Sequence, residues 1–457
     1  MTRRLILNAV VRGQLGGHTA AWRRSSADLS DVTTLDYWAD LAATLERGRF
    51  DTLFLADSLA LPADPGMPLQ WPIDPFVLIS ALAGRTRHIG LVATHSTTFN
   101  FAYTTARQLA SIDHLSAGRA GWNVVTSIDD SAALNYGSDR LTEHDLRYEI
   151  ADDYVDAVKK LWLAWGPSAV VADEKSGVLL DTAGVRAVNH ESVHLRVRGP
   201  LTTPRSPQGV PLIAQAGGSD QGIDLAGKHA DIVYARQLDI DSARVYYDRV
   251  KAAAVRHGRD PESVKILPGL VPVIGTSRQD ALAQIDALRS ADNLERRLPD
   301  LAVSLGIDVS ARDLDRDFPF DAVDPEPAAP TAAAAVTAAR AQGARSLRDV
   351  VHALYGAAAE SSGHRVSAGT PQQIADDIEH WFESGVLDGI SVHANVLPDD
   401  IEAFVDRVVP LLRDRGLVQE EYSPGTLRDK LALPLPDVDD SRFTPYWPNH
   451  ATVGAAS

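Results

Sequence analysis

Small and polar side chains end several apolar segments of this chain, where they could hold a ligand. In AQAGGSDQGIDLAGKHAD, residues 214–231, an apolar run ends at Gly217 and Gly218, and Ser219 takes the N-cap position of a following helix. Glycines let a ligand approach the backbone, while the free N–H groups and dipole of a helix start favour an anion such as a phosphate. An ordinary strand-to-helix turn with a capped helix would have the same residues, so both interpretations stay open.

A histidine and a tyrosine lie four residues apart near the start of a second predicted helix, residues 142–165. His144 and Tyr148 project together from a face that differs from the apolar stripe beginning at Leu146. Core packing does not account for this pair, and both side chains could reach the same phosphate. A solvated helix start is the simpler alternative.

Polar side chains also occur at the ends of three other apolar runs. Asp57 ends TLFLAD, Thr94 and Ser96 lie at the end of IGLVATHS, and Asn123 lies within GWNVVT. If these runs are parallel strands of a barrel, their carboxyl ends meet at one face, where binding and catalytic groups collect. We therefore predict that these residues belong to a site, although Asp57 could instead cap the turn that follows it.

Several aromatic residues are expected near the same face and could line a pocket for an apolar or planar ligand. They are Trp22, Trp71, Phe99, Phe101, Phe318 and Phe320. Plain core packing is the alternative for such residues. His18, in GGHTAAWR, could add a polar and catalytic contact in this region, and a surface histidine is its simpler interpretation.

Eight short apolar runs alternate with amphipathic helical patterns along the chain. The runs are residues 5–11, 52–57, 89–95, 121–126, 211–217, 231–236, 265–274 and 390–396, and helical patterns between them include 35–48, 102–115, 142–165 and 243–257. Strand followed by helix, repeated in this way, predicts parallel strands joined by right-handed crossovers. Because eight such strands close a barrel, we predict an α/β fold of the (β/α)8 TIM-barrel class.

Two connections are too long for simple loops. Residues 166–208 should form a small excursion, and residues 276–389 include several helical patterns and a Pro- and Ala-rich piece. If the second segment leaves the carboxyl end of a strand, it would lie over the barrel mouth as a lid. We assign residues 1–434 to one barrel domain and residues 435–457 to a C-terminal extension, which we expect to wrap the surface or a neighbouring protomer.

Composition and missing motifs exclude several classes of function. The formal net charge of −17 disfavours nucleic acid and anionic membranes as partners, and the absence of cysteine excludes disulfides and thiolate chemistry. No H-E-x-x-H, no G-x-S-x-G and no dinucleotide fingerprint occurs, so we expect no metal site and no NAD(P)H site of the usual kind. The first apolar run is too short for a signal peptide, and we expect a soluble cytoplasmic protein.

Longer stretches of the sequence resemble a known family. They are FDTLFLADSL, IGLVATHSTTFNFAYTTARQLASIDHLSAGRAGWNVVTS, GPLTTPRSPQGVPLIAQAGGSDQG, GTPQQIADDIEHWFESGVLDG and RGLVQEEYSPGTLRDKLAL. Together they are similar to the flavin-dependent monooxygenases that include nitrilotriacetate monooxygenase, pristinamycin synthase and dibenzothiophene sulfone monooxygenase, a branch of the bacterial luciferase-like barrels. The resemblance extends to about residue 434.

This resemblance implies a two-component monooxygenase that receives reduced FMN from a separate NAD(P)H-dependent flavin reductase and uses O2 as co-substrate. By position, Asp57, Thr94 and Ser96 would contact the isoalloxazine and ribityl parts. The phosphate would be held by His144, Tyr148, Gly218 and Ser219, and Asn123 would lie near the reactive face.

The resemblance leaves the substrate and the assembly as expectations. We expect a small apolar, aromatic or sulfur-containing substrate, and a homodimer or homotetramer. Two alternatives stay open, which are a deazaflavin-dependent hydride-transfer enzyme on the same barrel and a flavin-binding protein without catalysis.

Overall fold

A computed structural model gives the fold of most of the chain. The residues that it describes are 3–11, 15–61, 73–291, 298–309, 314–323, 336–337, 339–341, 343–351, 364–436, 438 and 441–447. Among these residues, no helix is long and apolar enough to cross a lipid bilayer.

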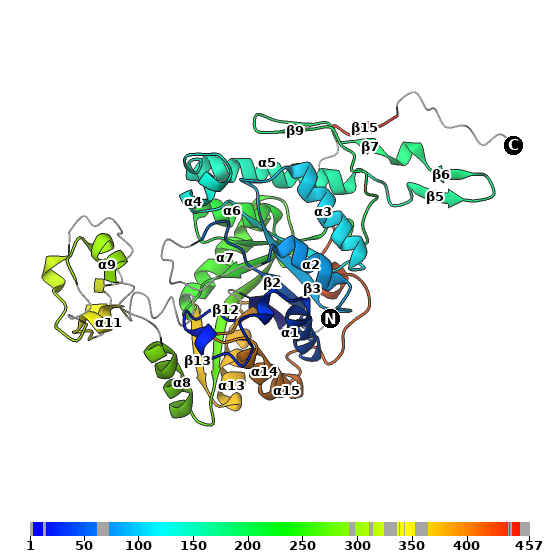
Figure 1. Ribbon diagram of the computed structural model, residues 1–457. Helices are drawn as coiled ribbons and strands as arrows, with labels where there is room; N and C mark the ends of the chain where they lie inside the picture. Colours follow the sequence, from blue (N-terminus) through cyan, green and yellow to red (C-terminus); the bar gives the residue numbers. More distant parts are fainter. Residues whose placement is uncertain are drawn as a thin grey trace.

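Eight parallel strands close a barrel, as the sequence predicts (Figure 1). They are β1 (Ile6–Val11), β2 (Thr52–Leu55), β3 (Gly90–Ser96), β4 (Ala120–Val125), β10 (Leu212–Ala216), β11 (Ile232–Ala235), β12 (Lys265–Ile274) and β14 (Gly389–His393). The sheet order is β11-β10-β4-β3-β2-β1-β14-β12, and the pairing of β11 with β12 closes the ring. The (β/α)8 fold class is thereby confirmed.

One further strand was not predicted. β13 (Arg365–Gly369) pairs in parallel with Leu270–Ile274, the second half of β12. Only the first half of β12, from Lys265 to Leu270, pairs with the barrel neighbours β11 and β14. Because β12 is longer than these pairings require, its free end adds a strand from the segment that was predicted to be an insertion.

Side chains alternate along the strands, and every second one faces the barrel interior. The interior core contains Ile6, Val10, Phe54, Val92, Leu212, Ala214, Ile232, Tyr234 and Leu267. Leu427 of the short helix α16 (Leu427–Lys430) joins this cluster and lies against the first residue of β3, so α16 closes the amino end of the barrel. Among the described residues, α16 thus covers the amino end, and the carboxyl end is left for a ligand.

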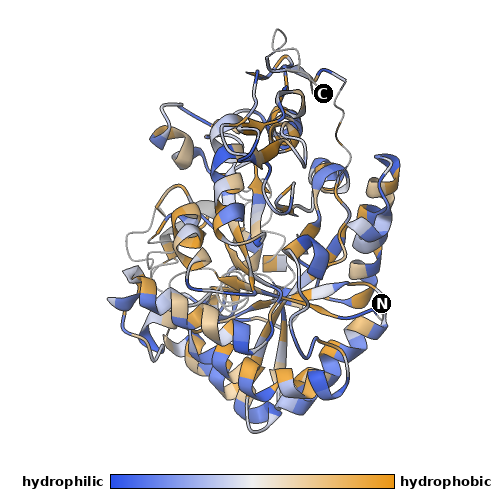
Figure 2. Cartoon of the chain, turned by 90° about the vertical axis from the view of Figure 1, so that its right-hand side faces the viewer, coloured by the Kyte–Doolittle hydropathy of each residue, from blue (hydrophilic) through white to orange (hydrophobic). Residues whose placement is uncertain are grey.

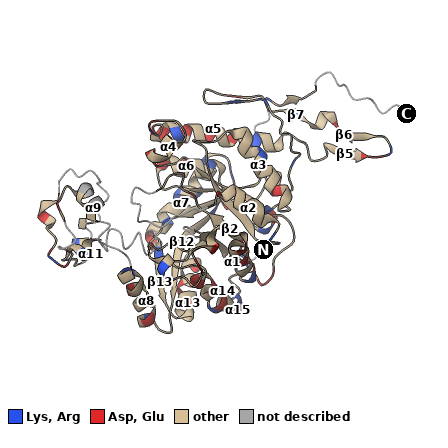
Figure 3. Cartoon of the chain, viewed as in Figure 1, with Lys and Arg blue, Asp and Glu red and all other residues tan. Residues whose placement is uncertain are grey.

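Helices surround the barrel and bury their apolar faces against it. They include α1 (Leu35–Arg47), α2 (Pro75–Ala83), α3 (Ala102–Leu115), α5 (His144–Leu163), α6 (Asp220–His229), α7 (Ile240–Arg256), α13 (Pro371–Glu383), α14 (Asp399–Arg407) and α15 (Val409–Asp414). Figure 2 shows mainly hydrophobic strands at the centre and helices of mixed polarity around them. Lys and Arg residues and Asp and Glu residues are both dispersed over these helices (Figure 3).

The buried stripe of α5 begins later than predicted. Ala157, Val158 and Leu161 are fully buried, but Leu146 is 39% exposed. The first turn of α5 therefore projects beyond the packed part of the barrel. This position leaves its side chains available to a ligand.

The first long connection forms an excursion of short antiparallel strands that projects from the barrel (Figure 1). Its strands are β5 (Val170–Asp173), β6 (Val178–Leu180), β7 (Arg186–Ala187), β8 (His190–Glu191) and β9 (Arg196–Val197). β15 (Thr444–Pro445), from the C-terminal extension, pairs antiparallel with β7, and Arg186 lies 4.4 Å over the ring of Phe443. The described part of the extension thus lies along this excursion.

The second long connection contains α8 (Arg278–Ala291), α9 (Leu298–Leu305) and α11 (Leu347–Val351). The last two helices share a separate hydrophobic cluster and lie beside the barrel (Figure 1).

Candidate active site

A cavity of about 1220 Å³ opens at the carboxyl end of the barrel. Its lining includes one residue from each of the eight barrel strands or the position that follows it: Val10, Phe54, Thr94, Asn123, Ala216, Tyr234, Gly269 and Ser391. A smaller pocket of about 290 Å³ adjoins it, since Asp57 and Thr94 line both. The polar strand ends therefore converge on one cavity, as expected from parallel strands.

Asn123 and Thr94 form the polar wall of this cavity. They are paired in register on neighbouring strands, and Asn123 Nδ2 donates to Thr94 Oγ1 at 3.0 Å. Asn123 is only 3% exposed, and its Oδ1 has no hydrogen-bond partner among the described residues. Buried polar atoms are nearly always hydrogen-bonded, so this oxygen is available to accept from a ligand or a water in the cavity.

Two neighbouring side chains extend the same wall. Ser96 Oγ lies 2.8 Å from Ser127 Oγ, and both residues line the smaller pocket. Gln215, on β10, lines this pocket as well, and its buried Oε1 also has no partner among the described residues. The larger cavity and the smaller pocket thus each have one buried acceptor oxygen without a partner among the described residues, on Asn123 and on Gln215.

Asp57 lies at the rim of both spaces. Burial raises the pKa of Asp57 to about 6, and the nearby Asp74 adds to this, whereas the hydrogen bond from Ser58 N opposes it. Because Asp57 accepts this hydrogen bond from Ser58 N, it also contributes to the turn that follows it, in part agreement with the alternative interpretation. A carboxyl with this pKa can act as either a hydrogen-bond donor or an acceptor near neutral pH.

The predicted helix start at the end of β10 is present. Ser219 is the N-cap of α6, and its Oγ accepts from Gly222 N at 3.1 Å. A Cβ added to Gly218 would meet nothing within 4 Å, whereas one added to Gly217 would lie 3.1 Å from Gly222 Cα. Gly217 is therefore required by the turn itself, and Gly218 leaves open space where a ligand can reach the backbone.

The starts of α5 and α6 are adjacent in space. The rings of His144 and Tyr148 lie 4.9 Å apart, as their spacing predicts. Asp145 Oδ1 accepts from Gln221 Nε2 of α6 at 2.9 Å and lies 2.8 Å from His144 Nδ1. The structure thus brings His144 and Tyr148 next to the turn that contains Ser219.

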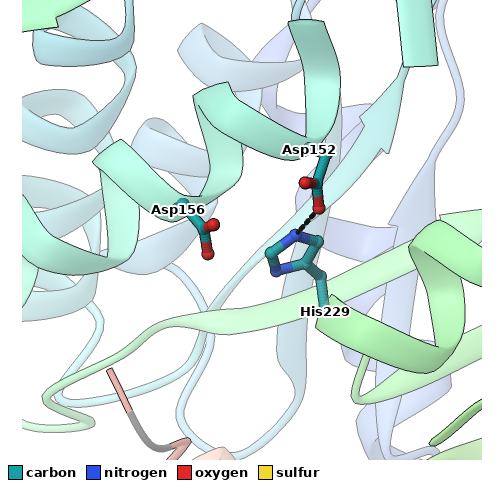
Figure 4. A group of neighbouring side chains, drawn as sticks. All are labelled: Asp152, Asp156 and His229. Atoms are coloured by element: carbon teal, nitrogen blue, oxygen red, sulfur yellow. Dashed lines mark hydrogen bonds and ion pairs between the residues drawn. The ribbon is translucent and has the colours of Figure 1, made fainter. Parts of the chain in front are cut away.

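A partly buried ionic cluster holds α5 and α6 together, as Figure 4 shows for three of its members. His229 Nε2 donates to Asp152 Oδ1 at 2.7 Å, and Lys228 Nζ donates to Asp152 and Asp156 at 2.7 and 3.1 Å. Lys159 Nζ donates to His229 Nδ1 at 2.9 Å.

This cluster has the ligand types of a metal site, because the acceptor atoms of Asp152, Asp156 and His229 lie within 4.8 Å of one another. However, the two ammonium groups already neutralise it. Burial, together with Lys159, lowers the pKa of His229 to about 4, so the imidazole is neutral at physiological pH. We interpret the cluster as a structural link that fixes α5 against α6, and with them the candidate phosphate site.

Sequence reasoning missed several residues that line the cavity. Arg147 follows His144 by three residues, donates to Thr142 O, and has a buried Nε without a partner among the described residues. Arg236, His364 and His393 line the cavity from other strands. The short spacing from His144 could have identified Arg147, but no local signal marks the other three.

The predicted aromatic wall is not found. Trp22 is 50% exposed and Phe101 is 81% exposed, while Phe99 stacks on Tyr136 with ring centroids 4.4 Å apart. Phe318 is 4% exposed and packs edge-to-face on Phe320 in the cluster of α9 and α11. None of these residues lines either space, and Trp71 lies outside the described residues. The sequence does not show where the loops that contain these residues lie in the fold. In the structure the described aromatic side chains of this set pack against other residues or face solvent.

His18 is buried, not at the surface as its simpler interpretation had it, but it does not line the cavity either. Its Nδ1 accepts from Ala20 N at 3.0 Å, so it stabilises its own turn. Of the predicted lid, residues 276–389, His364 lines the cavity, whereas no described residue between 276 and 351 does, so the lid stays a prediction.

A closed parallel barrel whose polar strand ends line one cavity at its carboxyl end defines a protein of the TIM-barrel class with a ligand-sized site at the barrel mouth. The family model of luciferase-like monooxygenases matches residues 15–388. This chain belongs to that family and is an enzyme of the monooxygenase class, which confirms the resemblance found in the sequence.

Characterised relatives cover nearly the whole chain. N-acetyl-S-(2-succino)cysteine monooxygenase of Bacillus subtilis (strain 168) is 39% identical over 92% of this chain and 95% of its own. Nitrilotriacetate monooxygenase component A of Aminobacter aminovorans is 36% identical over 92% and 95%, respectively.

Solved structures agree with this relationship. EDTA monooxygenase of Chelativorans sp. BNC1 has a TM-score of 0.79 and 32% identity, covering 95% of this chain and 99% of its own. A riboflavin lyase solved with modified FMN and riboflavin has a TM-score of 0.78 and 30% identity, covering 94% and 95%.

Proposed function

We propose that this chain is the oxygenase component of a two-component monooxygenase that uses reduced FMN and O2. The observation that carries the proposal is the buried Oδ1 of Asn123, which lines the cavity without a partner among the described residues. An isoalloxazine ring carries N–H donors and carbonyl acceptors on one edge, and such a ring matches a wall of this kind. The riboflavin lyase, solved with modified FMN, supports the choice of flavin.

The residues of the site fit the two ends of FMN. In the proposed complex, Asp57, Thr94 and Ser96 contact the isoalloxazine and ribityl parts, and Asn123 lies near the reactive face. His144, Tyr148, Gly218 and Ser219 hold the phosphate at the helix starts. Arg147 lies among the same elements and adds a positive charge to this end of the cavity.

When bound and reduced, FMN supplies the two electrons that let one atom of O2 enter the substrate while the other leaves as water. This chain contributes binding, orientation and the exclusion of water from the barrel interior. Asp57, with its pKa of about 6, can exchange a proton at the rim of the cavity.

The electrons require a partner, because the sequence has no dinucleotide fingerprint. We propose a separate NAD(P)H-dependent flavin reductase. The names of relatives support a two-component arrangement, because the nitrilotriacetate enzyme is called component A and two different subunits of pristinamycin IIA synthase match this chain. A homodimer or homotetramer remains our expectation for this chain.

The substrate is proposed as a small sulfur-containing organic compound. Relatives named for N-acetyl-S-(2-succino)cysteine, dibenzothiophene sulfone and dimethyl sulfide support this choice. The aromatic residues on which we based the expectation of an aromatic substrate do not line the cavity, but Phe54 and Tyr234 do.

A reconstituted assay tests the proposed function. The purified chain is supplied with FMN, NADH and any flavin reductase under isotopically labelled dioxygen, with a panel of thioethers, sulfoxides and sulfones. We expect labelled oxygen in one product, and no turnover when the reductase is omitted. Hydrogen peroxide as the sole product across the panel would support a flavin-binding protein without catalysis, and anaerobic turnover with a deazaflavin would support hydride transfer.

A further inference from the structure

One side of the cavity has no role in the proposed flavin site. The flavin residues lie on β2, β3, β4, β10 and the starts of α5 and α6, whereas β11, β12 and β14 follow one another around the rest of the ring. Arg236, His393, Gly269 and Ser391 of this second side line the cavity, and so does His364, which directly precedes β13 and lies against Gly269 of β12. Two stacked imidazoles and a guanidinium thus face the space that is left for a substrate.

Arg236 is the charged group of this side. Tyr234 and Arg236 are two residues apart, and both line the cavity, as strand alternation requires. Arg236 is exposed, and no described residue forms a hydrogen bond or an ion pair with it. Its charge is therefore available to an incoming anion.

The two histidines lie next to Arg236 across the strand order. Ala235 is paired with Pro268, so Arg236, one residue further, lies beside Gly269. A Cβ added to Gly269 would lie 2.1 Å from His364 Nδ1, so the absence of a side chain there is what admits the His364 ring. That ring stacks on His393 with centroids 4.0 Å apart. Arg236, His364 and His393 therefore form one group.

Carboxylates also line the cavity, but they lie elsewhere and are engaged. Asp57 accepts from Ser58 N at 2.8 Å, Asp129 accepts from Ser131 N at 2.9 Å as the N-cap of α4 (Asp130–Asn135), and Asp130 accepts from Leu141 N at 2.9 Å. None of these groups comes from β11, β12 or β14. None of these three carboxylates forms an ion pair with Arg236.

We infer that Arg236, His364 and His393 form a subsite for a carboxylate group of the substrate, so that this enzyme acts on small organic acids. A planar guanidinium binds a carboxylate through two parallel hydrogen bonds, and imidazole N–H groups can add further donors. Phe54 and Tyr234, whose rings lie 4.4 Å apart deeper in the barrel, offer an apolar surface to the rest of the molecule. The inference rests on the proposed function, which assigns the opposite side of the cavity to FMN.

Matched acids and amides test the subsite by calorimetry. The probes are phenylthioacetate and phenylthioacetamide, succinate and succinamide, and benzoate and benzamide, each titrated into the full chain with and without FMN. We expect the wild type to bind at least one acid with about tenfold or higher affinity than its amide. Arg236→Met should abolish this preference while leaving the affinity for FMN within about twofold.

Three further variants complete the test, two of them as controls. Arg107→Met removes the same charge from an exposed position on α3, outside the cavity, and should retain the preference for acids. Arg236→Lys should retain part of it, since the charge remains while the planar fork is lost. His393→Asn should reduce the affinity for the acid without affecting that for the amide.

Several results would overturn the inference. These are equal binding of acids and amides by the wild type for every pair, unchanged acid binding by Arg236→Met, or a parallel loss of FMN affinity in that variant, which would assign Arg236 to the flavin. Failure of the proposed function gives a different pattern, because FMN would then fail to bind the wild type while the acid preference is still measured without it.

Discussion

Replacing Ser219 with aspartate should separate phosphate binding from helix stability. Ser219 caps α6, and its side chain accepts from Gly222 N at 3.1 Å. Aspartate caps helices as well as serine does, and a negative charge at a helix start is favourable. Ser219→Asp should therefore leave the apoprotein folded, while it introduces a charge that repels the FMN phosphate.

The magnitude follows from the position of the cap. Two unit charges about 5 Å apart at an effective dielectric constant of about 20 interact by roughly 3 kcal/mol. A phosphate monoester carries about 1.5 to 2 negative charges near neutral pH, and salt reduces the repulsion. A net penalty of about 3 kcal/mol corresponds to a loss of roughly 100-fold in affinity for FMN.

Flavin fluorescence titrations measure the effect, with Ser219→Asn as the matched control. Asparagine has nearly the same size as aspartate and caps the helix equally well, but it has no charge. We expect the two variants to differ by about 100-fold for FMN and to bind riboflavin, which has no phosphate, equally. Equal FMN affinities of the two variants would show that the phosphate does not bind at this turn and would refute the assignment.

Three further predictions follow from other parts of the structure. Gly218→Ala should leave thermal stability unchanged, since its Cβ meets nothing within 4 Å, but should weaken FMN binding at least fivefold by titration. As a control, Gly84→Ala, whose Cβ would meet only Ala81 O at 3.8 Å, should change neither stability nor FMN affinity. Wild-type FMN affinity of Gly218→Ala would argue against a contact between FMN and the backbone there. Arg428→Ala should lower the free energy of unfolding in urea by about 3 kcal/mol, because it leaves the buried carboxylate of Asp231 with only the more distant guanidinium of Arg259, at 4.0 Å, as an ion-pair partner among the described residues. Arg340→Ala, from the exposed pair with Asp321, should cost less than about 1 kcal/mol. A loss near that of Arg340→Ala would show that Asp231 is not held by this ion pair. Because burial raises the pKa of Asp57 from 3.8 to about 6, its ionisation destabilises the folded state as pH rises through that window. The free energy of unfolding of Asp57→Asn should therefore rise relative to that of the wild type, by on the order of 1 kcal/mol, as pH increases from about 4 to about 6.5, and this difference should stay constant at higher pH. A difference in the free energy of unfolding that does not vary with pH would contradict the raised pKa of Asp57.

Much of the architecture was predictable because its signals are local. Each apolar run that forms a barrel strand is interrupted by polar, glycine or proline residues within a few positions, and each helix pattern repeats over adjacent turns. The turn at Gly217, Gly218 and Ser219 is equally local, since an N-cap and its N–H partner lie three residues apart. The pair His144 and Tyr148 was predictable from helical spacing for the same reason.

The remaining features depend on contacts between distant parts of the chain. β13 pairs with the free end of β12, which lies about ninety residues earlier in the chain. The sequence of β13 alone does not distinguish it from other short polar segments. Arg236, His364 and His393 meet because the closed ring places β11, β12 and β14 side by side and because Gly269 leaves room for a ring.

The predicted aromatic residues also show that local sequence does not determine which side chains line a cavity. Phe318 and Phe101 are of a residue type that often lines pockets, but Phe318 is buried in a separate hydrophobic cluster and Phe101 faces solvent. The sequence specifies which segments form strands, helices and caps, since those depend on neighbouring residues. Which side chains share a cavity depends on barrel closure and strand register, and these are set by long-range pairing that no short stretch of sequence contains.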